Sequence, residues 1–285
     1  MFVFPNPKEI EISGIKLGGQ TGKNPPALVG TMFYAGHNVL TETGFDGEKA
    51  ESLLNLHIQA SHDSGLPSMM NVFGGAGEDV LVKQVEFVLD RAKIPVLIDS
   101  QDAKIRLGAL RRLEEVGAAK RLIYNSLNMT ISQSEISALK ESNIESAIIL
   151  AYSATDTSLE GKIALLEKDC AFGKGLLELA CDCGIKNVLI DTAMTPVASG
   201  AGIALRALPG LKAKFGLPTG CAMHNAVSAW DYVRTRSTRK SVDLASNLLP
   251  PALGADFLFY GPIENAGSAF DIARFGYELA REGIE

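Results

Sequence analysis

The sequence contains few of the residues that build metal and redox sites. It has four cysteines and four histidines among 285 residues. Cys181 and Cys183 are two apart in a predicted helix, where they point to different sides, and no second close pair completes a zinc or iron–sulfur motif. His57 and His62 are five apart on another predicted helix, a poor spacing for sharing a metal. We therefore expect reduced, partly buried thiols and no bound metal ion.

Long apolar runs and concentrated basic charge are also missing. No apolar run approaches the roughly 18 residues of a membrane-spanning helix, and the N-terminus has neither the charged start nor the long apolar core of a secretory signal. The net charge is -6, and the densest basic run, residues 234–240, is short, so we interpret it as a solvated helix end. We expect a cytoplasmic protein with no nucleic-acid partner and no membrane insertion.

One glycine-containing segment partly matches the loop of dinucleotide-binding proteins. Gly200-Ala-Gly202 begins like such a loop, but Leu205 stands where the third glycine would be. No acidic residue follows at about twenty positions, so the sequence does not favour a bound nicotinamide cofactor.

Short apolar runs alternate with helical patterns along most of the chain. Asn187-Val-Leu-Ile-Asp191 is typical: a continuous apolar run predicts a strand that is buried on both faces. Eight such runs over about 255 residues predict a (β/α)8 barrel, with a doubly wound sheet as the alternative. A short hairpin is expected before it, over residues 8–20. No linker or low-complexity run divides the chain, so we expect one domain over residues 1–285. The predicted strands are residues 27–34, 69–73, 95–99, 121–125, 146–151, 187–191, 217–223 and 255–260.

Polar side chains follow four of these strands. Asp99, Asn125, Asp191 and Asn225 come after the third, fourth, sixth and seventh strands. Each alone could be a helix cap. In a barrel, however, the carboxyl ends of all strands share one face, so the four would line one mouth. Two acids and two amides suit a flat heterocycle that carries donors and acceptors on its edge.

At these positions the chain resembles a known family. It is similar to the H subunit of tetrahydromethanopterin S-methyltransferase and to the stand-alone bacterial methylcorrinoid:tetrahydrofolate methyltransferases, nearly from end to end. These proteins resemble the wider pterin-binding methyltransferases and dihydropteroate synthases, which are barrels that hold the pterin in the mouth. The matching segments are Gly30-Thr-Met-Phe-Tyr-Ala35, Leu97-Ile-Asp-Ser100, Ala119-Lys-Arg-Leu-Ile-Tyr-Asn-Ser126, Lys214-Phe-Gly-Leu-Pro218, His224-Asn225, Ser228-Ala-Trp-Asp231 and Tyr260-Gly-Pro-Ile-Glu-Asn265.

The resemblance implies a role for each matching residue. Asp99, Asn125 and Asp191 would hydrogen-bond the pterin edge, and Asn225 would be the catalytic residue near N5, the nitrogen that carries the methyl group. His224 is its competitor for that place. The remaining expected substrate-binding residues are Asn71, Ser126, Gly220 and His224.

The implied reaction moves a methyl group from a methylated corrinoid to N5 of tetrahydrofolate, giving 5-methyltetrahydrofolate. Tetrahydromethanopterin is the alternative pterin, since it presents the same edge. Because no Asp-x-His-x-x-Gly run for cobalt ligation is present, the corrinoid is expected on a partner protein, with no tightly bound cofactor on this chain. A homodimer is also expected.

Three other functions are weighed against this one. A Schiff-base aldolase needs a lysine at the carboxyl end of a strand, and no predicted strand ends in lysine. A dihydropteroate synthase would need a basic anion site at the strand ends, which the sequence does not show. A non-enzymatic protein that only docks a corrinoid protein would not need four convergent polar residues.

Overall fold

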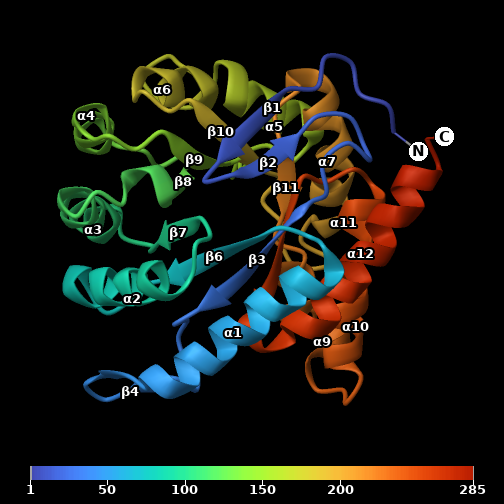
Figure 1. The fold of residues 1–285 in the computed structure, drawn as a ribbon. Helices are drawn as coiled ribbons and strands as arrows, with labels where there is room; N and C mark the ends of the chain where they lie inside the picture. Colours follow the sequence, from blue (N-terminus) through green and yellow to red (C-terminus); the bar gives the residue numbers. More distant parts are fainter. Residues whose placement is uncertain (1, 285) are drawn as a thin grey trace.

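Eight parallel strands close into a barrel in the computed structural model, which describes residues 2–284. Helices lie between successive strands around its outside (Figure 1). The predicted barrel is therefore confirmed, and the doubly wound sheet is wrong. The barrel strands are β3 (Ala27–Met32), β6 (Ser68–Phe73), β7 (Val96–Asp99), β8 (Leu122–Leu127), β9 (Ser146–Leu150), β10 (Asn187–Asp191), β11 (Thr219–Cys221) and β12 (Phe257–Pro262).

Local signals fix where the outer helices begin and end. Ser132 caps α4, since its hydroxyl accepts the N–H of Glu135. Asp46 caps α1 in the same way, and Gly65 ends that helix with a φ of 70°. The helices that surround the barrel are α1 (Gly47–Ser64), α2 (Glu78–Arg91), α3 (Ala103–Glu115), α4 (Gln133–Glu141), α5 (Leu159–Glu167), α6 (Leu176–Asp182), α7 (Ala201–Phe215) and α12 (Ala266–Glu282).

The predicted N-terminal hairpin closes the amino-terminal end of the barrel. Strands β1 (Glu9–Ile12) and β2 (Ile15–Gly18) pair antiparallel across that end, in the upper part of Figure 1. Ile12 and Leu17 are buried in the same cluster as inward-facing Leu97, Ile123 and Leu189. Apolar side chains thus fill the barrel interior and its amino-terminal opening, which leaves the carboxyl ends of the strands as the open face.

The loops at the open face contain elements that the sequence did not predict. A two-stranded hairpin, β4 (Leu40–Thr41) with β5 (Gly44–Phe45), follows the first barrel strand. After β11, where the alternating pattern predicts helix, the chain forms four short helices: α8 (His224–Ser228), α9 (Asp231–Arg234), α10 (Arg239–Ser246) and α11 (Leu249–Ala252).

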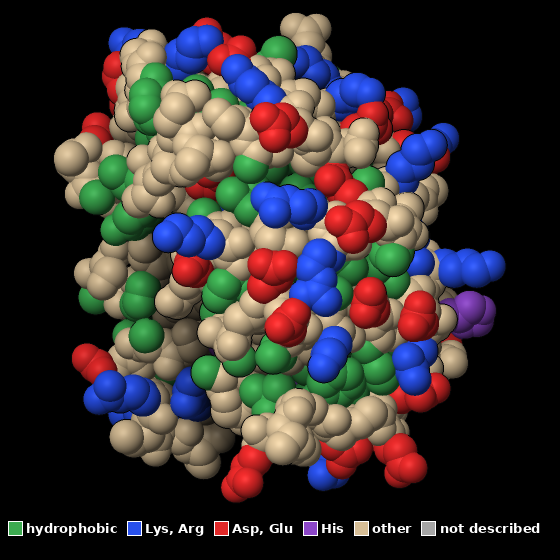
Figure 2. Space-filling view, turned by 90° about the vertical axis from the view of Figure 1, so that its left-hand side faces the viewer, with side chains coloured by type: hydrophobic (Ala, Val, Ile, Leu, Met, Phe, Trp, Pro, Cys, Tyr) green, Lys and Arg blue, Asp and Glu red, His purple; other side chains and the backbone are tan. Residues whose placement is uncertain are grey.

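The outer surface carries mixed charge. Figure 2 shows acidic and basic side chains interspersed over the face on which α2, α3 and α4 lie. Within residues 2–284, no helix combines the length and apolar character needed to cross a bilayer.

Candidate active site

A cavity of about 650 Å³ opens at the carboxyl ends of the strands. Seven of the eight expected site residues line it, from four strands and α8. Gly220 is the exception: it lies inside β11, where an added Cβ would be 2.2 Å from the Phe257 carbonyl oxygen, so the expected substrate contact is not met. The lining consists of Thr31, Tyr34, Asn71, Phe73, Asp99, Gln101, Asn125, Ser126, Leu150, Asp191, Ala222, His224, Asn225, Phe259, Gly261 and Pro262.

Three neighbouring strands join their polar side chains into one chain of hydrogen bonds. Asn125 Nδ2 on β8 donates to Asn71 Oδ1 on β6, at 3.2 Å, and Asn71 Nδ2 donates to Asp99 Oδ2 on β7, at 3.0 Å. Each amide uses one donor and leaves other capacity free. The arrangement fixes the side chains in place while keeping donors and acceptors available to a ligand.

The two carboxylates of the cavity are less acidic than usual. Burial raises the pKa of Asp99 to about 6, partly offset by the hydrogen bond from Asn71. Burial likewise raises the pKa of Asp191 to about 6, although its carboxylate accepts the N–H of Ala193 at 2.7 Å. Both side chains can therefore change charge close to neutral pH.

His224 is held by a carboxylate behind it. Its Nδ1 lies 2.8 Å from Asp243 Oδ2 on α10. Since a carboxylate accepts hydrogen bonds, Nδ1 is the donor in this contact, and in the neutral imidazole the lone pair then lies on Nε2. Gly261 allows this packing: its φ is 91°, and an added Cβ would meet the His224 ring at 2.6 Å. Asn225, next in the chain, is exposed at the cavity and lies in the first turn of α8.

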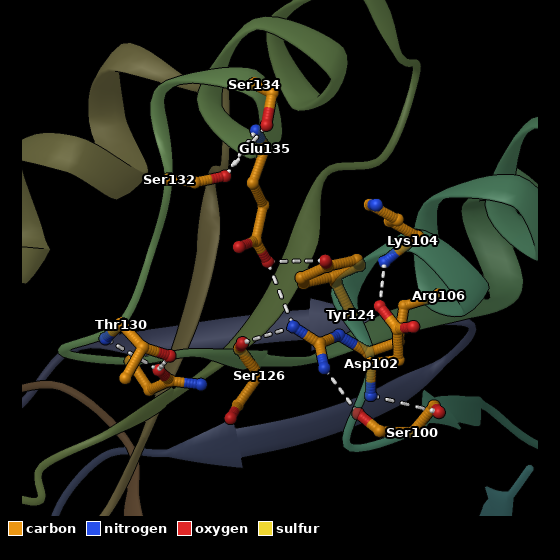
Figure 3. A network of polar contacts seen from close by, with 11 residues as sticks. Ser100, Asp102, Lys104, Arg106, Tyr124, Ser126, Thr130, Ser132, Ser134 and Glu135 are labelled. Atoms are coloured by element: carbon orange, nitrogen blue, oxygen red, sulfur yellow. Dashed lines mark hydrogen bonds and ion pairs between the residues drawn. The ribbon is translucent and has the colours of Figure 1, made fainter. Parts of the chain in front are cut away.

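A buried arginine connects the ends of β7 and β8 from the outside of the barrel (Figure 3). Arg106 on α3 donates to the main-chain oxygens of Ser100 and Ser126, the residues that follow Asp99 and Asn125. Its charge is balanced by Glu135, at 3.0 Å, which also accepts the Tyr124 hydroxyl hydrogen at 2.6 Å. This network holds two site-bearing strand ends in a fixed relation.

Sequence reasoning missed the apolar walls and the supporting residues. Tyr34 was noticed only as a strand end, yet it lines the cavity and its hydroxyl donates to Glu264 at 3.3 Å. Phe73 is a further wall residue that strand position could have indicated, because it lies at the carboxyl end of β6. Phe259, inside β12, also lines the cavity. Asp243 has no local signal, since it is 19 residues from His224.

The histidines and acidic residues do not gather as metal ligands would. Within the described part of the chain, no group of three or more His, Cys, Asp or Glu side chains is arranged to hold an ion. His57 is buried against Tyr260, with Nδ1 2.8 Å from its hydroxyl, whereas His62 is exposed, so the two do not meet.

A second hollow, of about 690 Å³, lies at the opposite end of the barrel. Its lining comes from the segments before β8, β9 and β10, among them Lys120, Glu145 and Lys186. None of the expected site residues contributes to it, and catalytic groups of such barrels lie at the carboxyl face. The mouth cavity is therefore the candidate active site.

Solved structures of low sequence identity share the fold. A dihydropteroate synthase of Yersinia pestis with a pterine–sulfa conjugate superposes with a TM-score of 0.64 at 15% identity, over 95% of this chain and 98% of that one. A dihydropteroate synthase of Xanthomonas albilineans in complex with 7,8-dihydropteroate gives 0.59 at 17% identity, over 93% and 95%.

Sequence relatives match along the whole chain. The H subunit of tetrahydromethanopterin S-methyltransferase from Methanopyrus kandleri is 38% identical, over all of this chain and 95% of its own length. The H subunit of a putative mtx methyltransferase from Methanosarcina mazei is 40% identical, over all of this chain and 94% of its own. Residues 6–276 match the family described as the tetrahydromethanopterin S-methyltransferase MtrH subunit. The chain therefore belongs to the MtrH family of methyltransferase subunits.

Proposed function

We propose that this protein transfers a methyl group between a corrinoid and N5 of a tetrahydropterin bound in the mouth cavity. The proposal depends above all on one observation: two buried or partly buried carboxylates and three asparagine amides converge in one cavity of about 650 Å³, in a member of this family. Such a set matches a flat heterocycle with N–H donors and ring acceptors along one edge. A protein that only docked a partner would not need it.

The comparisons favour tetrahydromethanopterin over the tetrahydrofolate that we expected from the sequence. The relatives with assigned substrates, such as the Methanopyrus kandleri protein, are named for tetrahydromethanopterin. Both pterins present the same edge, so the residues proposed to contact that edge do not distinguish between them. We therefore propose tetrahydromethanopterin as the first substrate to test, with tetrahydrofolate beside it.

Binding and alignment are the main work of the cavity residues. Asp99 and Asp191 would accept N–H groups of the pterin, and Asn125 with Asn71 would complete its edge. The N5 lone pair then attacks the methyl carbon, and the electrons of the cobalt–carbon bond leave with the cobalt. Holding nitrogen and methyl in line removes much of the entropic barrier of this displacement.

N5 must also release its proton when it gains the methyl group. Asn225 can hydrogen-bond N5 as its protonation changes, but an amide cannot take the proton. His224, whose Nε2 has a free lone pair because Nδ1 faces Asp243, can accept it. We assign stabilisation of N5 to Asn225 and proton transfer to His224.

The methyl-carrying corrinoid is proposed to arrive on a partner protein. The relatives are named as H subunits, which supports a larger assembly. No tightly bound cofactor on this chain is proposed. The homodimer expected from the sequence finds no support in the comparisons and stays a prediction.

Two measurements test the function. Titration calorimetry with each tetrahydropterin reports binding, and single-turnover reaction with methylcob(III)alamin reports transfer through the absorbance of cob(I)alamin. Asp191→Asn protein is the control for binding at this cavity. If neither pterin binds to the wild type, the proposal is wrong and the docking role is favoured. Pterin binding without any methyl transfer contradicts the proposed reaction.

A further inference from the structure

Lys162 is a buried lysine behind the candidate active site that the proposed reaction does not use. Its exposed fraction is 3%, and it extends from α5. Its Nζ donates to the main-chain oxygens of Ala151, at 2.8 Å, and Thr192, at 2.9 Å. Ala151 follows β9 and Thr192 follows β10, so a single ammonium group joins the ends of two neighbouring strands.

The charge of Lys162 has no close counter-ion. Among residues 2–284, no carboxylate oxygen lies within 4.0 Å of its Nζ. Carbonyl oxygens satisfy its hydrogen bonds but do not neutralise it, and burying an unpaired ammonium is strongly unfavourable. The other buried cations differ: Lys212 pairs with Asp256 at 2.7 Å, and Arg106 with Glu135 at 3.0 Å.

Asp191 is the acidic group on which this charge acts. It precedes Thr192 and lines the cavity, whereas Lys162 does not line it. Burial raises the pKa of Asp191, and the hydrogen bond from the Ala193 N–H and the ammonium of Lys162 both oppose that rise. The other titratable groups near Asp191 are the Cys221 thiol on β11, and Asp99 and His224 of the cavity lining.

We propose that Lys162 is a positioning residue that fixes the ends of β9 and β10 and supplies the positive charge that keeps Asp191 ionised. A neutral residue at position 162 could fill the same space but would not favour the ionised form of Asp191. This role explains why an unfavourable buried charge is present. The benefit for pterin recognition rests on the proposed function, but the ionisation of Asp191 does not.

The test is a carboxyl titration of Asp191 in the pterin-free protein. Selectively ¹³C-labelled aspartate gives the signal, and Asp191→Asn identifies it. In Lys162→Gln, which keeps a donor but loses the charge, the Asp191 pKa should rise by about one unit or more. Lys162→Arg should restore the wild-type value. The double variant Lys212→Gln/Asp256→Asn removes another buried lysine together with its partner, and it should leave the Asp191 titration unchanged.

Pterin binding provides the functional measurement. Near pH 6, Lys162→Gln should bind tetrahydromethanopterin about ten-fold more weakly than the wild type, and the gap should narrow by pH 8 as Asp191 ionises. An unchanged Asp191 titration in folded Lys162→Gln protein overturns the proposal. A shifted titration in a protein that binds no pterin counts against the proposed function alone.

A reciprocal experiment covers the case in which Lys162→Gln does not fold. Coupling between two titrating groups is symmetric. Asp191→Asn should therefore lower the pKa of Lys162 by the same amount as Lys162→Gln raises the pKa of Asp191. Labelled lysine reports this directly. A Lys162 pKa that is equal in the wild type and in Asp191→Asn overturns the proposal.

Discussion

Replacing Asp99 by asparagine should stabilise the free protein while it weakens pterin binding. Burial raises the pKa of Asp99 from 3.8 to about 6, which at about 1.4 kcal/mol per unit makes the folded carboxylate unfavourable by about 3 kcal/mol. Asp99 is only partly buried, so solvent screening reduces this figure, and we expect a gain of about 1–3 kcal/mol. The new side-chain oxygen can still accept the hydrogen bond from Asn71.

The gain should depend on pH in a defined direction. A carboxyl group with a raised pKa favours its neutral form in the folded state, so its destabilising effect is complete above pH 6. The effect shrinks as the pH falls toward 3.8, because the wild-type group becomes protonated. The free energy of unfolding of the Asp99→Asn protein should therefore exceed that of the wild type by more at pH 8 than at pH 5.

Calorimetric melting and ligand titration measure the two effects. At pH 8 the Tm of Asp99→Asn should be about 2–8 °C higher. Its pterin affinity should fall by about 1–3 kcal/mol, the scale of a charge-assisted hydrogen bond. Asp63→Asn, on the exposed surface of α1, is the matched control and should change neither. A Tm of Asp99→Asn at or below the wild-type value at pH 8 would refute the reasoning that this charge is kept for binding.

Four further predictions follow from the site and the fold. Asn225→Ala should lower the single-turnover rate about ten- to a thousand-fold and should reduce pterin affinity much less. If pterin affinity is lost while the rate is unchanged, Asn225 is a binding residue and His224 is the group near N5. Arg106→Met should cost about 3–5 kcal/mol in chemical denaturation, because Glu135 is left buried and unpaired, whereas equal stability would contradict that pairing. Leu17→Ala should cost about 2–5 kcal/mol by opening a cavity under the barrel; a loss below about 1 kcal/mol would mean that the hairpin does not seal it. Purified protein should contain no stoichiometric cobalt or zinc by elemental analysis, and metal that survives dialysis and is needed for activity would overturn this.

The order of elements could be predicted from local sequence. The apolar run that ends at Asp191 is a signal between near neighbours, and β10 forms over the residues where it was expected. Repeating that alternation eight times leaves few ways to bury the strands other than a closed barrel. The mouth positions of Asp99, Asn125 and Asp191 then follow, because parallel strands all end on one face.

The loops were harder to predict. The β4–β5 hairpin and the helices after β11 are short, so a hydrophobic period extends over too few residues to indicate reliable boundaries there. Gly220 illustrates the same difficulty within a strand. Its identity is explained by close approach to the Phe257 backbone, which no local pattern reveals.

The sequence by itself determined the barrel, its open face and the residues that could line it. Only the tertiary structure decided which residues support them. Asp243 contacts His224, and Arg106 joins the ends of two strands. Lys162, which has no close counter-ion, acts on the charge of Asp191. These partners are brought together by barrel closure and lie on separate elements. A hydrogen bond or charge between distant elements leaves no periodic trace in the sequence, because periodicity records only which face of its own element a residue occupies.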